Sequence, residues 1–397
     1  MKTKLKILAV AAWYPSKNDL YNGVFIKEHL HSISNDCDIK ILFVEGDKDL
    51  RKLISISANY SYNLTEIIVY YKIFSFSVNF FHKLNQYILY PLATLYGYGY
   101  FFLKFGKPEL IHVHVLSRVG IIPLFLKLIF KIPYVISEQY TRYLPEDGSY
   151  KTNGIHHFLT KLIVNNSLGI SAISKHLMLY MNKLGLKSKY QSIIPNVLND
   201  CFLISFHSKN ISDKLNIVHA STLNEAQKNF SGILKALKIV QKQNIPFTFH
   251  VYGGYEPYLS KAKQLAKQNP LIDVRFYGKV NKGQLAKAFA NADVTLLFSN
   301  YETQGCVIFE SLASGTPVIA CDLEAIKEII NPKLGDLVER GNYIQLANSI
   351  INFKQENYDS VYLRNFALAN FSLEVIRVKW LSFYSGVFNK NFYNKTG

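Results

Sequence analysis

Residues 293–321 read DVTLLFSNYETQGCVIFESLASGTPVIAC, and their pattern is the strongest indication of the fold. A buried strand is expected through Leu297, because apolar residues run without interruption there. A loop with Glu302 and Gly305 follows, a helical pattern begins near Cys306, and PVIAC reads as a second strand. A strand, a helix and another strand in this order predict a crossover unit of a parallel sheet.

The same alternation continues along the chain. Strand-like runs are KILAVAA, IKILFV, LIHVHV and PYVIS in the first half and NIVHAS, FTFHVYG and DVRFYG before the stretch above, with helical patterns such as VFIKEHLHSI between them. Residues 195–215 break the pattern with Pro, Asn, Ser and Asp, as a linker would. The 397 residues suit two domains of about 150 to 200 residues each. We expect an α/β protein with two doubly wound, Rossmann-like domains, 1–205 and 206–372, and a final helix in 373–397 that crosses back to the first domain.

Composition narrows the class of protein. Hydrophobic residues make up 49% and charged residues 18%, which is typical of a folded globular chain. Four cysteines without CxxC pairing argue against a disulfide framework and a zinc site. Neither half has a G-x-G-x-x-G, the dinucleotide-binding motif, so the sequence does not favour a dehydrogenase. The net charge of +17 favours an anionic partner, either a membrane surface, a phosphorylated substrate or nucleic acid, without choosing among them.

The N-terminus resembles a secretory signal, since MKTKLKILAVAAWYP has lysines, a short apolar run and an A-x-A tripeptide. The apolar run from Leu5 to Ala12 also fits the first buried strand of a parallel sheet, and a helical pattern follows it directly. We therefore expect a cytoplasmic chain.

Glu310 is an unusual residue within the segment 293–321, because it is charged and stands among apolar residues. It stands between Phe309 and Leu312 on the predicted helix, where a carboxylate is costly to bury without partners. Such a carboxylate can accept hydrogen bonds from the vicinal hydroxyls of a ribose. Gly305 lets the backbone approach a ligand, and the free N–H groups of the following helix attract phosphate. The alternative is that Glu302 caps this helix and Glu310 pairs with a surface lysine.

The motif E-x-x-G-x-x-x-x-E, followed by a small-residue helix end and PVIA, resembles glycosyltransferase family 4, the group 1 glycosyl transferases of GT-B fold. Further segments resemble the same family: LEAIKEII, IIPN at Ile193–Asn196, GISAISKHL, and LIHVHVLSRVGIIPLFLKLIFKIPYVISEQYT. The resemblance extends over about residues 5 to 345. It implies a GT-B fold and binding of a nucleotide sugar without a metal or other cofactor.

The resemblance also implies roles for single residues. Glu310 would bind ribose, Glu302 would contact the donor sugar, and the amides of Gly305 and Cys306 would lie near the sugar or the diphosphate. Lys228 in LNEAQKNFSG matches the lysine that binds the diphosphate. A fixed ammonium and a helix N-terminus can stabilise the departing nucleoside diphosphate.

Three further positions follow from the resemblance. Gly23 in LYNGVFIKEH matches a glycine that faces the diphosphate across the cleft. Thr222 stands where the family often has arginine, and Gln139 stands where it often has a histidine that contacts the donor sugar. Glutamine still forms hydrogen bonds but cannot titrate. These two departures leave the identity of the nucleotide sugar, and activity itself, open.

Two other signals carry less weight. Asp36-Cys37-Asp38 has the DxD form of metal-dependent glycosyltransferases, but it stands at the entry to the strand IKILFV. His112 and His114 point to one face of a strand, as metal ligands would, yet no third ligand is evident. We expect no metal site, and His114, near the carboxyl end of its strand, is the acceptor-side candidate.

Residues 70–105 are rich in aromatic residues and have lysines in or beside them. Pro91, Gly97 and Gly99 argue against a membrane span, which leaves a core helix or an interfacial surface on an anionic bilayer.

We expect a retaining glycosyltransferase that moves a hexose from a nucleotide sugar to a saccharide or lipid-linked acceptor in bacterial cell-surface polysaccharide or glycolipid synthesis. Its expected location is the cytoplasm, with a peripheral position at the inner face of the cell membrane as a variant of this expectation. The alternatives are a nucleotide-sugar epimerase of the same fold, and a non-catalytic protein that binds anionic lipid or nucleic acid. Nucleic acid is the less favoured partner of these.

Overall fold

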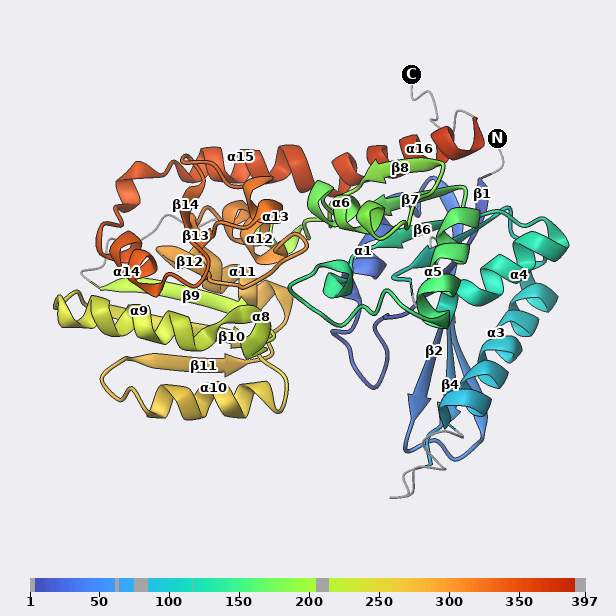
Figure 1. Cartoon of the computed structure of the whole chain (residues 1–397), viewed down its shortest axis with the longest axis horizontal. Helices are drawn as coiled ribbons and strands as arrows, with labels where there is room; N and C mark the ends of the chain where they lie inside the picture. Colours follow the sequence, from blue (N-terminus) through green and yellow to red (C-terminus); the bar gives the residue numbers. More distant parts are fainter. Residues whose placement is uncertain (1–3, 61–63, 75–84, 117, 205–213, 390–397) are drawn as a thin grey trace.

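The computed structural model describes residues 4–60, 64–74, 85–116, 118–204 and 214–389. Two sheets, each flanked by helices, lie side by side (Figure 1). The first sheet has the order β3-β4-β2-β1-β5-β6-β7-β8, and the second has the order β11-β10-β9-β12-β13-β14. Their strands pair in parallel, except that β3 pairs antiparallel with β4 at an edge.

The elements of the N-terminal domain are β1 (Leu5–Ala11), α1 (Val24–Ile33), β2 (Cys37–Asp47), β3 (Ile54–Tyr60), β4 (Leu64–Lys72), the helical turn η1 (Asn85–Leu89), α3 (Tyr90–Phe105), β5 (Leu110–His114), η2 (Arg118–Gly120), α4 (Ile121–Phe130), β6 (Tyr134–Glu138), η3 (Thr141–Tyr143), α5 (Ile155–Asn166), β7 (Gly169–Ala172), α6 (Lys175–Lys183) and β8 (Tyr190–Ile193).

The remaining elements are α7 (Cys201–Ile204), β9 (Leu215–Ser221), α8 (Glu225–Lys228), α9 (Phe230–Lys242), β10 (Phe247–Gly253), α10 (Tyr258–Lys267), β11 (Val274–Gly278), α11 (Lys282–Ala290), β12 (Val294–Leu297), α12 (Cys306–Ala313), β13 (Val318–Cys321), α13 (Glu324–Lys327), β14 (Gly335–Val338), α14 (Tyr343–Ile351), η4 (Gln355–Asn357), α15 (Ser360–Phe371) and α16 (Leu373–Phe388).

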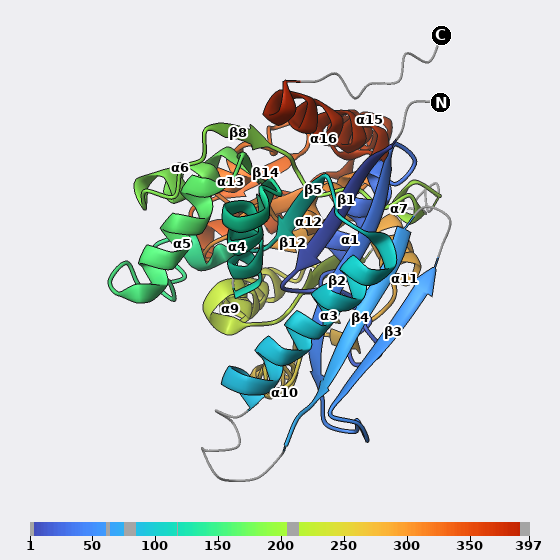
Figure 2. The ribbon, with the colours of Figure 1, turned by 90° about the vertical axis from the view of Figure 1, so that its right-hand side faces the viewer.

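The central strands are apolar on both faces because helices cover both faces of the sheet. In β1, Leu8 and Val10 pack toward the side of α3, α4 and α5, whereas Ile7 and Ala9 pack toward the side of α1 and α16. Figure 2 looks onto this domain and shows α3 and α4 next to each other. The first domain therefore has two hydrophobic cores, one on each face of its sheet.

The last helix, α16, follows the C-terminal domain in the sequence but packs on the N-terminal one. The indole of Trp380 is fully buried there among the residues of β1 and α1. The guanidinium of Arg377 donates to both carboxylate oxygens of Asp36, at 2.7 and 2.6 Å. Helix α16 thus covers part of one face of the first sheet, beside α1.

The interdomain segment leaves β8 at Ile193 and reaches β9 at Leu215, and residues 205–213 within it lie outside the described residues. Its first part is anchored to the end of α15, because the Leu198 amide donates to the Phe371 carbonyl at 2.7 Å. The carboxyl ends of both sheets then face one space between the domains, where ligands of open α/β sheets bind.

Candidate active site

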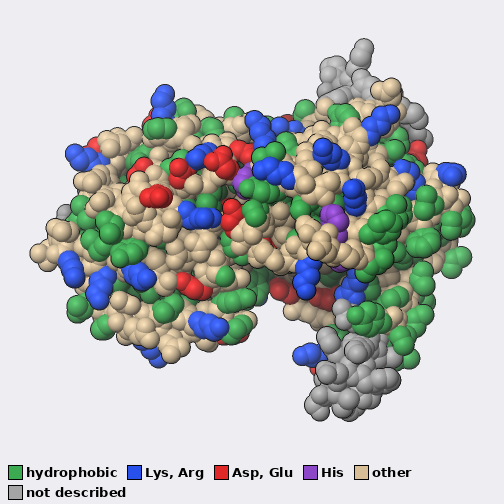
Figure 3. Space-filling view, viewed as in Figure 1, with side chains coloured by type: hydrophobic (Ala, Val, Ile, Leu, Met, Phe, Trp, Pro, Cys, Tyr) green, Lys and Arg blue, Asp and Glu red, His purple; other side chains and the backbone are tan. Residues whose placement is uncertain are grey.

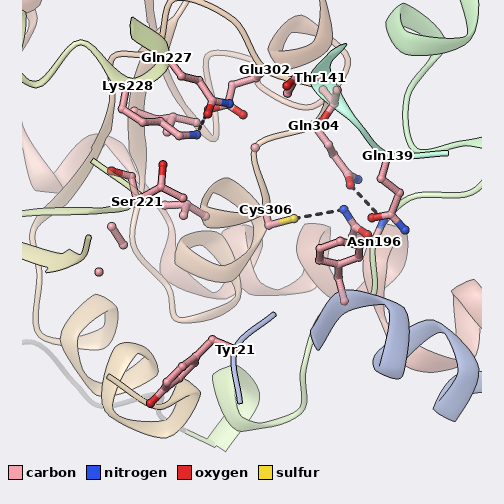
Figure 4. A pocket seen from close by; sticks show the side chains of 18 of the residues that line it. Tyr21, Gln139, Thr141, Asn196, Ser221, Gln227, Lys228, Glu302, Gln304 and Cys306 are labelled. Atoms are coloured by element: carbon pink, nitrogen blue, oxygen red, sulfur yellow. Dashed lines mark hydrogen bonds and ion pairs between the residues drawn. The ribbon is translucent and has the colours of Figure 1, made fainter. Parts of the chain in front are cut away.

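A cavity of about 560 Å³ lies between the two domains. From the N-terminal domain it is lined by Trp13, Tyr21, Phe25, Gln139, Tyr140 and Thr141. From the linker and the C-terminal domain it is lined by residues that include Asn196, Ser221, Thr222, Gln227, Lys228, Tyr252, Gly253, Lys279, Glu302, Gln304, Gly305, Cys306 and Val307 (Figure 4). The structure therefore brings six of the predicted residues to one cavity: Gln139, Thr222, Lys228, Glu302, Gly305 and Cys306.

Lys228 and Glu302 form an ion pair in the wall of this cavity (Figure 4). Lys228 ends α8, a single turn that Asn224 caps through its side chain. The Ser299 hydroxyl donates a second hydrogen bond to the same carboxylate at 2.8 Å. The two charged side chains are only 12% and 6% exposed, so the ammonium is fixed in a water-poor position. Such a cation stabilises developing negative charge without reorganising.

The start of α12 forms a neighbouring part of the wall. Gly305 is its N-cap with φ +76°, a backbone conformation that favours glycine, and no side chain caps this end. Gly305, Cys306 and Val307 all line the cavity. The helix thus begins in the cavity without a side-chain cap, where its N–H groups and dipole favour an anion.

Cys306 contributes its backbone here rather than a reactive thiol. Burial raises the pKa of the Cys306 thiol to about 12, so the sulfur stays protonated at neutral pH. Its Sγ accepts a hydrogen bond from the side-chain amide of Asn196 at 3.2 Å.

Gln139 reaches the cavity from the opposite domain. Its side chain is only 7% exposed, and its Nε2 has no hydrogen-bond partner among the described residues. A buried amide without a partner is costly, and a ligand hydroxyl in the cavity would supply the missing acceptor. Gln139 is therefore placed to donate a hydrogen bond to a ligand.

Glu138 holds Gln139 in position. It is fully buried and accepts hydrogen bonds from the backbone amides of Leu116, Gln139 and Tyr140, at 2.8, 2.8 and 2.9 Å. Burial raises the pKa of the Glu138 carboxyl to about 6, and the three amides act against that rise. One carboxylate thus ties the loops after β5 and β6 together.

A buried hydrogen-bond chain connects α16 to the loop before α12. The indole Nε1 of Trp380 donates to Nδ1 of His29 at 3.0 Å, so Nε2 of His29 carries the proton and donates to Oδ1 of Asn196 at 3.1 Å. Asn196 in turn donates from its amide side chain to Cys306 and from its backbone to Gln304 Oε1 at 3.0 Å (Figure 4). The last helix of the chain therefore helps to fix the wall of the cavity.

The position of Thr222 is set by a second buried histidine. His219 donates from Nδ1 to the Leu296 carbonyl at 2.9 Å, which leaves its Nε2 to accept from the Ser221 hydroxyl at 2.8 Å. Ser221 then accepts from the Leu223 amide at 3.0 Å and turns the loop that carries Thr222. The threonine brings no charge to the cavity, but a second cation, Lys279, lines it from the loop after β11.

Three predicted residues lie outside the cavity lining. Gly23 is the N-cap of α1, with φ +65°, and a Cβ there would meet the backbone of Trp13 at 2.5 Å. His114 is fully buried, and its ring lies 3.9 Å from that of His112, centroid to centroid. The structure therefore places Gly23 in a tight backbone contact and His114 in the core, and brings neither to the cavity.

Glu310 is the third of these residues. It lies on α12, and burial raises the pKa of its carboxyl to about 7, against the effect of the nearby Lys282 ammonium. Lys282 of the C-terminal domain pairs with Glu28 of α1, which also accepts from Asn199 at 2.8 Å. Glu310 thus lies beside a charged contact between the domains, and its predicted role as ribose ligand stays a prediction.

The DxD-like triplet has structural partners. Asp36 pairs with Arg377, and Asp38 pairs with Lys40. Within the described residues, no group of three or more His, Cys, Asp or Glu side chains is arranged to hold a metal ion.

Several of these residues were not anticipated from the sequence. Glu138 and His29 each stand in an ordinary local pattern, SEQYT and KEHLHS. Glu138 could have been noticed from the sequence, because it directly precedes the predicted Gln139. His29 had no local signal, since its partners lie 167 and 351 residues away.

Comparison with known proteins agrees with this geometry. The family model of the group 1 glycosyl transferases matches residues 204–367. The alpha-monoglucosyldiacylglycerol synthase of Streptococcus pneumoniae is 33% identical over 126 residues, 32% of this chain and 28% of that protein. The phosphatidyl-myo-inositol mannosyltransferase of Mycobacterium leprae is 30% identical over 131 residues, 32% of this chain and 34% of that protein.

Solved structures match nearly the whole chain. Sucrose-phosphate synthase from Thermosynechococcus elongatus has a TM-score of 0.76 at 17% identity, covering 97% of this chain and 99% of that one. Anabaena HepE in complex with UDP and glucose has a TM-score of 0.70 at 15% identity, covering 96% and 100%. The fold is therefore GT-B. Residues 204–367, most of the C-terminal domain, are similar to the group 1 glycosyl transferases. The matches to the two curated relatives span about a third of their length.

Proposed function

We propose that this protein is a glycosyltransferase that moves a hexose from a nucleotide sugar to a saccharide or lipid-linked acceptor, with retention of anomeric configuration and without a metal ion. Retention and metal independence rest on the family resemblance, because the residues themselves identify no carboxylate pair for a double displacement. The proposed setting is the synthesis of a cell-surface polysaccharide or glycolipid, on the cytoplasmic side of the membrane.

The observation that carries the proposal is the meeting of three features in one cavity. The Lys228–Glu302 pair, the uncapped start of α12 and the unpartnered amide of Gln139 all lie in its walls. The first two suit a diphosphate leaving group, and the third suits a sugar hydroxyl from the other domain. A diphosphate in contact with Lys228 would compete with Glu302 for the ammonium and free that carboxylate to accept from the sugar.

The class of substrate is proposed from the relatives. HepE has been solved with UDP-glucose, which supports a UDP-sugar as the first donor to test. By their names, the synthase makes a monoglucosyldiacylglycerol and the mannosyltransferase acts on phosphatidyl-myo-inositol, which supports a lipid acceptor. Lys279 is the cation that would partly replace the arginine missing at Thr222.

Turnover of the nucleotide sugar with and without acceptor tests the proposal. The purified chain is first screened with UDP-, GDP- and ADP-sugars by thermal shift, and any sugar that raises Tm is then assayed in EDTA. A transferase releases nucleoside diphosphate much faster when a glycolipid acceptor is present. An epimerase would convert the nucleotide sugar without acceptor, and a binding protein would turn over none. Either of those results would overturn the proposed transfer.

A further inference from the structure

Helix α4, with the sequence IIPLFLKLIF, is apolar on its outer as well as its inner side. Pro123, Leu124 and Leu126 are buried against the sheet, while Phe125 and Ile129 remain 58% and 64% exposed. A surface helix of a globular protein normally carries polar residues on its outer side. The outer side of α4 therefore matches an apolar environment better than water.

The neighbouring helices continue this apolar surface. On α5, Ile155 and Phe158 are 71% and 61% exposed and lie one turn apart. On α3, Leu95 and Leu103 are 59% and 92% exposed. Figure 3 shows hydrophobic side chains gathered on this side of the N-terminal domain. We call the exposed apolar side chains of α3, α4 and α5 the apolar face.

The three helices are held next to each other by specific contacts. Lys127 of α4 donates to the carbonyl of Asn166 at the end of α5. Lys107, just after α3, donates to the carbonyl of Phe130 at the end of α4, at 3.0 Å. The three helices therefore present their exposed apolar side chains on one side of the domain, and apolar surfaces of this kind mark interaction sites.

The charges on the apolar face itself are positive, and the exposed Glu109 lies just beyond α3 at its border. Helices α3, α4 and α5 contain no Asp or Glu, and the exposed Lys104, Lys107, Lys131 and Lys161 lie on or just beyond them. Lys107, Lys131 and Lys161 form no ion pair with a carboxylate in the part of the chain that the structure describes. Aromatic and aliphatic side chains with lysines around them suit the interface of a bilayer that contains anionic lipid.

We propose that the apolar face binds the headgroup region of an anionic lipid bilayer. This deepens and rests on the proposed transfer to a lipid-linked acceptor. A second copy of this chain is a poorer occupant, because two such faces would bring like charges together in a protein of net charge +17. Helix α4 has ten residues and is about 15 Å long, half of the roughly 30 Å hydrocarbon core, so it lies along the surface.

The location of the surface changes the sequence-based expectation. Residues 70–105 contribute α3, but β4 takes residues up to Lys72, and residues 75–84 lie outside the described residues. The apolar face extends over α4 and α5, which the sequence did not single out. In the described residues, no helix is long and apolar enough to cross a membrane.

One stretch of chain connects part of the cavity wall to part of the apolar face. Strand β6 leads through Gln139 and Thr141, which line the cavity, into η3 and then into α5. In Figure 1, α5 lies on the side of α4 that faces the other domain. Helix α5 is thus the part of the apolar face that lies on the side of the cavity, where a lipid-linked acceptor would arrive.

Co-sedimentation of the whole chain with vesicles tests the proposal. The vesicles contain phosphatidylglycerol and phosphatidylcholine in equal parts, or phosphatidylcholine alone, at low salt. The parent protein should bind the anionic vesicles, and Phe125→Glu with Ile129→Glu should weaken the apparent partition by about ten-fold or more. The matched control is Ile344→Glu with Val361→Glu, two residues that are 55% and 54% exposed on the C-terminal domain, and it should bind like the parent.

A second variant tests the charges and avoids any loss of apolar packing. Lys131→Glu with Lys161→Glu keeps every apolar side chain and should still weaken binding to anionic vesicles by about ten-fold. Equal vesicle binding by parent and both double variants would overturn the proposal. The proposal would also be overturned if the parent protein does not bind vesicles but self-associates in light scattering, and if Phe125→Glu with Ile129→Glu abolishes that self-association.

Failure of this inference is distinguishable from failure of the proposed function. Hydrolysis of the nucleotide sugar and its thermal shift are measured in the same variants without lipid. Intact turnover with no vesicle binding would reject the membrane surface alone. Vesicle binding with no effect of any nucleotide sugar would reject the transferase and leave the membrane surface.

Discussion

Helices α4 and α9 each pack on a face of the sheet of their own domain, and they differ in what they present to solvent. Both bury an apolar side, with Leu124 in α4 and Leu237 in α9. The outer side of α9 carries the exposed Lys235 and Lys238, whereas that of α4 carries Phe125 and Ile129. The outer side of α9 therefore suits water, whereas the outer side of α4 suits the apolar environment that we propose for it.

The interiors of the two domains differ in a similar way. In the C-terminal domain, His219 is fully buried but both of its ring nitrogens have hydrogen-bond partners. In the N-terminal domain, neither nitrogen of His114 has a partner among the described residues. The buried His219 of the C-terminal domain is thus fully hydrogen-bonded, whereas the buried His114 of the N-terminal domain is not.

The largest effect is expected for the charged pair of the C-terminal domain. Lys228→Ala should lower turnover of the nucleotide sugar by about 100-fold or more, because one fixed cation of the leaving-group site is lost. Lys235→Ala, on the outer side of α9, is the matched control and should turn over like the parent. Single-turnover rates and nucleoside diphosphate affinities measure the effect. Parent-like turnover in Lys228→Ala would mean that the diphosphate is held elsewhere.

A smaller effect is expected for Glu310. If its carboxylate accepts hydrogen bonds from ribose, Glu310→Gln should weaken nucleoside diphosphate binding by about 1 to 3 kcal/mol. Isothermal titration measures this, with Glu324→Gln on the exposed surface as control. Unchanged affinity in a folded variant would confine Glu310 to the interdomain contact beside Lys282 and Glu28.

The smallest effect concerns stability against pH and compares the two domains directly. Burial holds the pKa of His114 well below 6.5, so the unfolded chain binds more protons in acid, and stability present above pH 6.5 is lost as the pH falls. His114→Phe removes this titration and leaves no unpartnered nitrogen. Its loss of unfolding free energy between pH 7.5 and 5.5 should be smaller than the parent's by about 1 kcal/mol.

Urea unfolding at both pH values measures this difference, and His31→Phe on the exposed surface is the control. Glu310 of the C-terminal domain should act with the opposite sign. Its pKa is raised from 4.5 to about 7, so the stability that it contributes is present below pH 4.5 and is lost as the pH rises through 7. An equal pH response in His114→Phe and the parent would contradict the assigned cost of burying this histidine.

The sequence predicted the features that are local in the chain. The loop from Glu302 to Cys306 and its flanking strands lie within one strand-helix-strand unit, so their order alone places them at one edge of a sheet. Edge strand β3 was missed, because the apolar alternation of ISISANY is short and its residues are at most partly buried. The role of Glu138 was missed because its carboxylate accepts a hydrogen bond from the amide of Leu116, which follows a different strand, β5.

The roles of single residues were harder to predict from the sequence than the fold. The sequence placed His114 near the cleft from its position at the end of a strand, but only the packing of α16 shows that Trp380 and Tyr384 cover this part of the sheet. The Asn196 contacts to His29 and Cys306 likewise join segments that are 167 and 110 residues apart. Such contacts follow from tertiary packing and leave no periodic signal.

The return of α16 to the first sheet has a consequence for how the protein is made. A ribosome delivers β1 and α1 early, yet Trp380, Tyr384 and Arg377 emerge only after the whole C-terminal domain. The second domain can fold as it is synthesised, whereas the face of the first sheet that α1 and α16 share stays partly uncovered until α16 has been synthesised. The part of the protein that is translated first is therefore the part that finishes folding last.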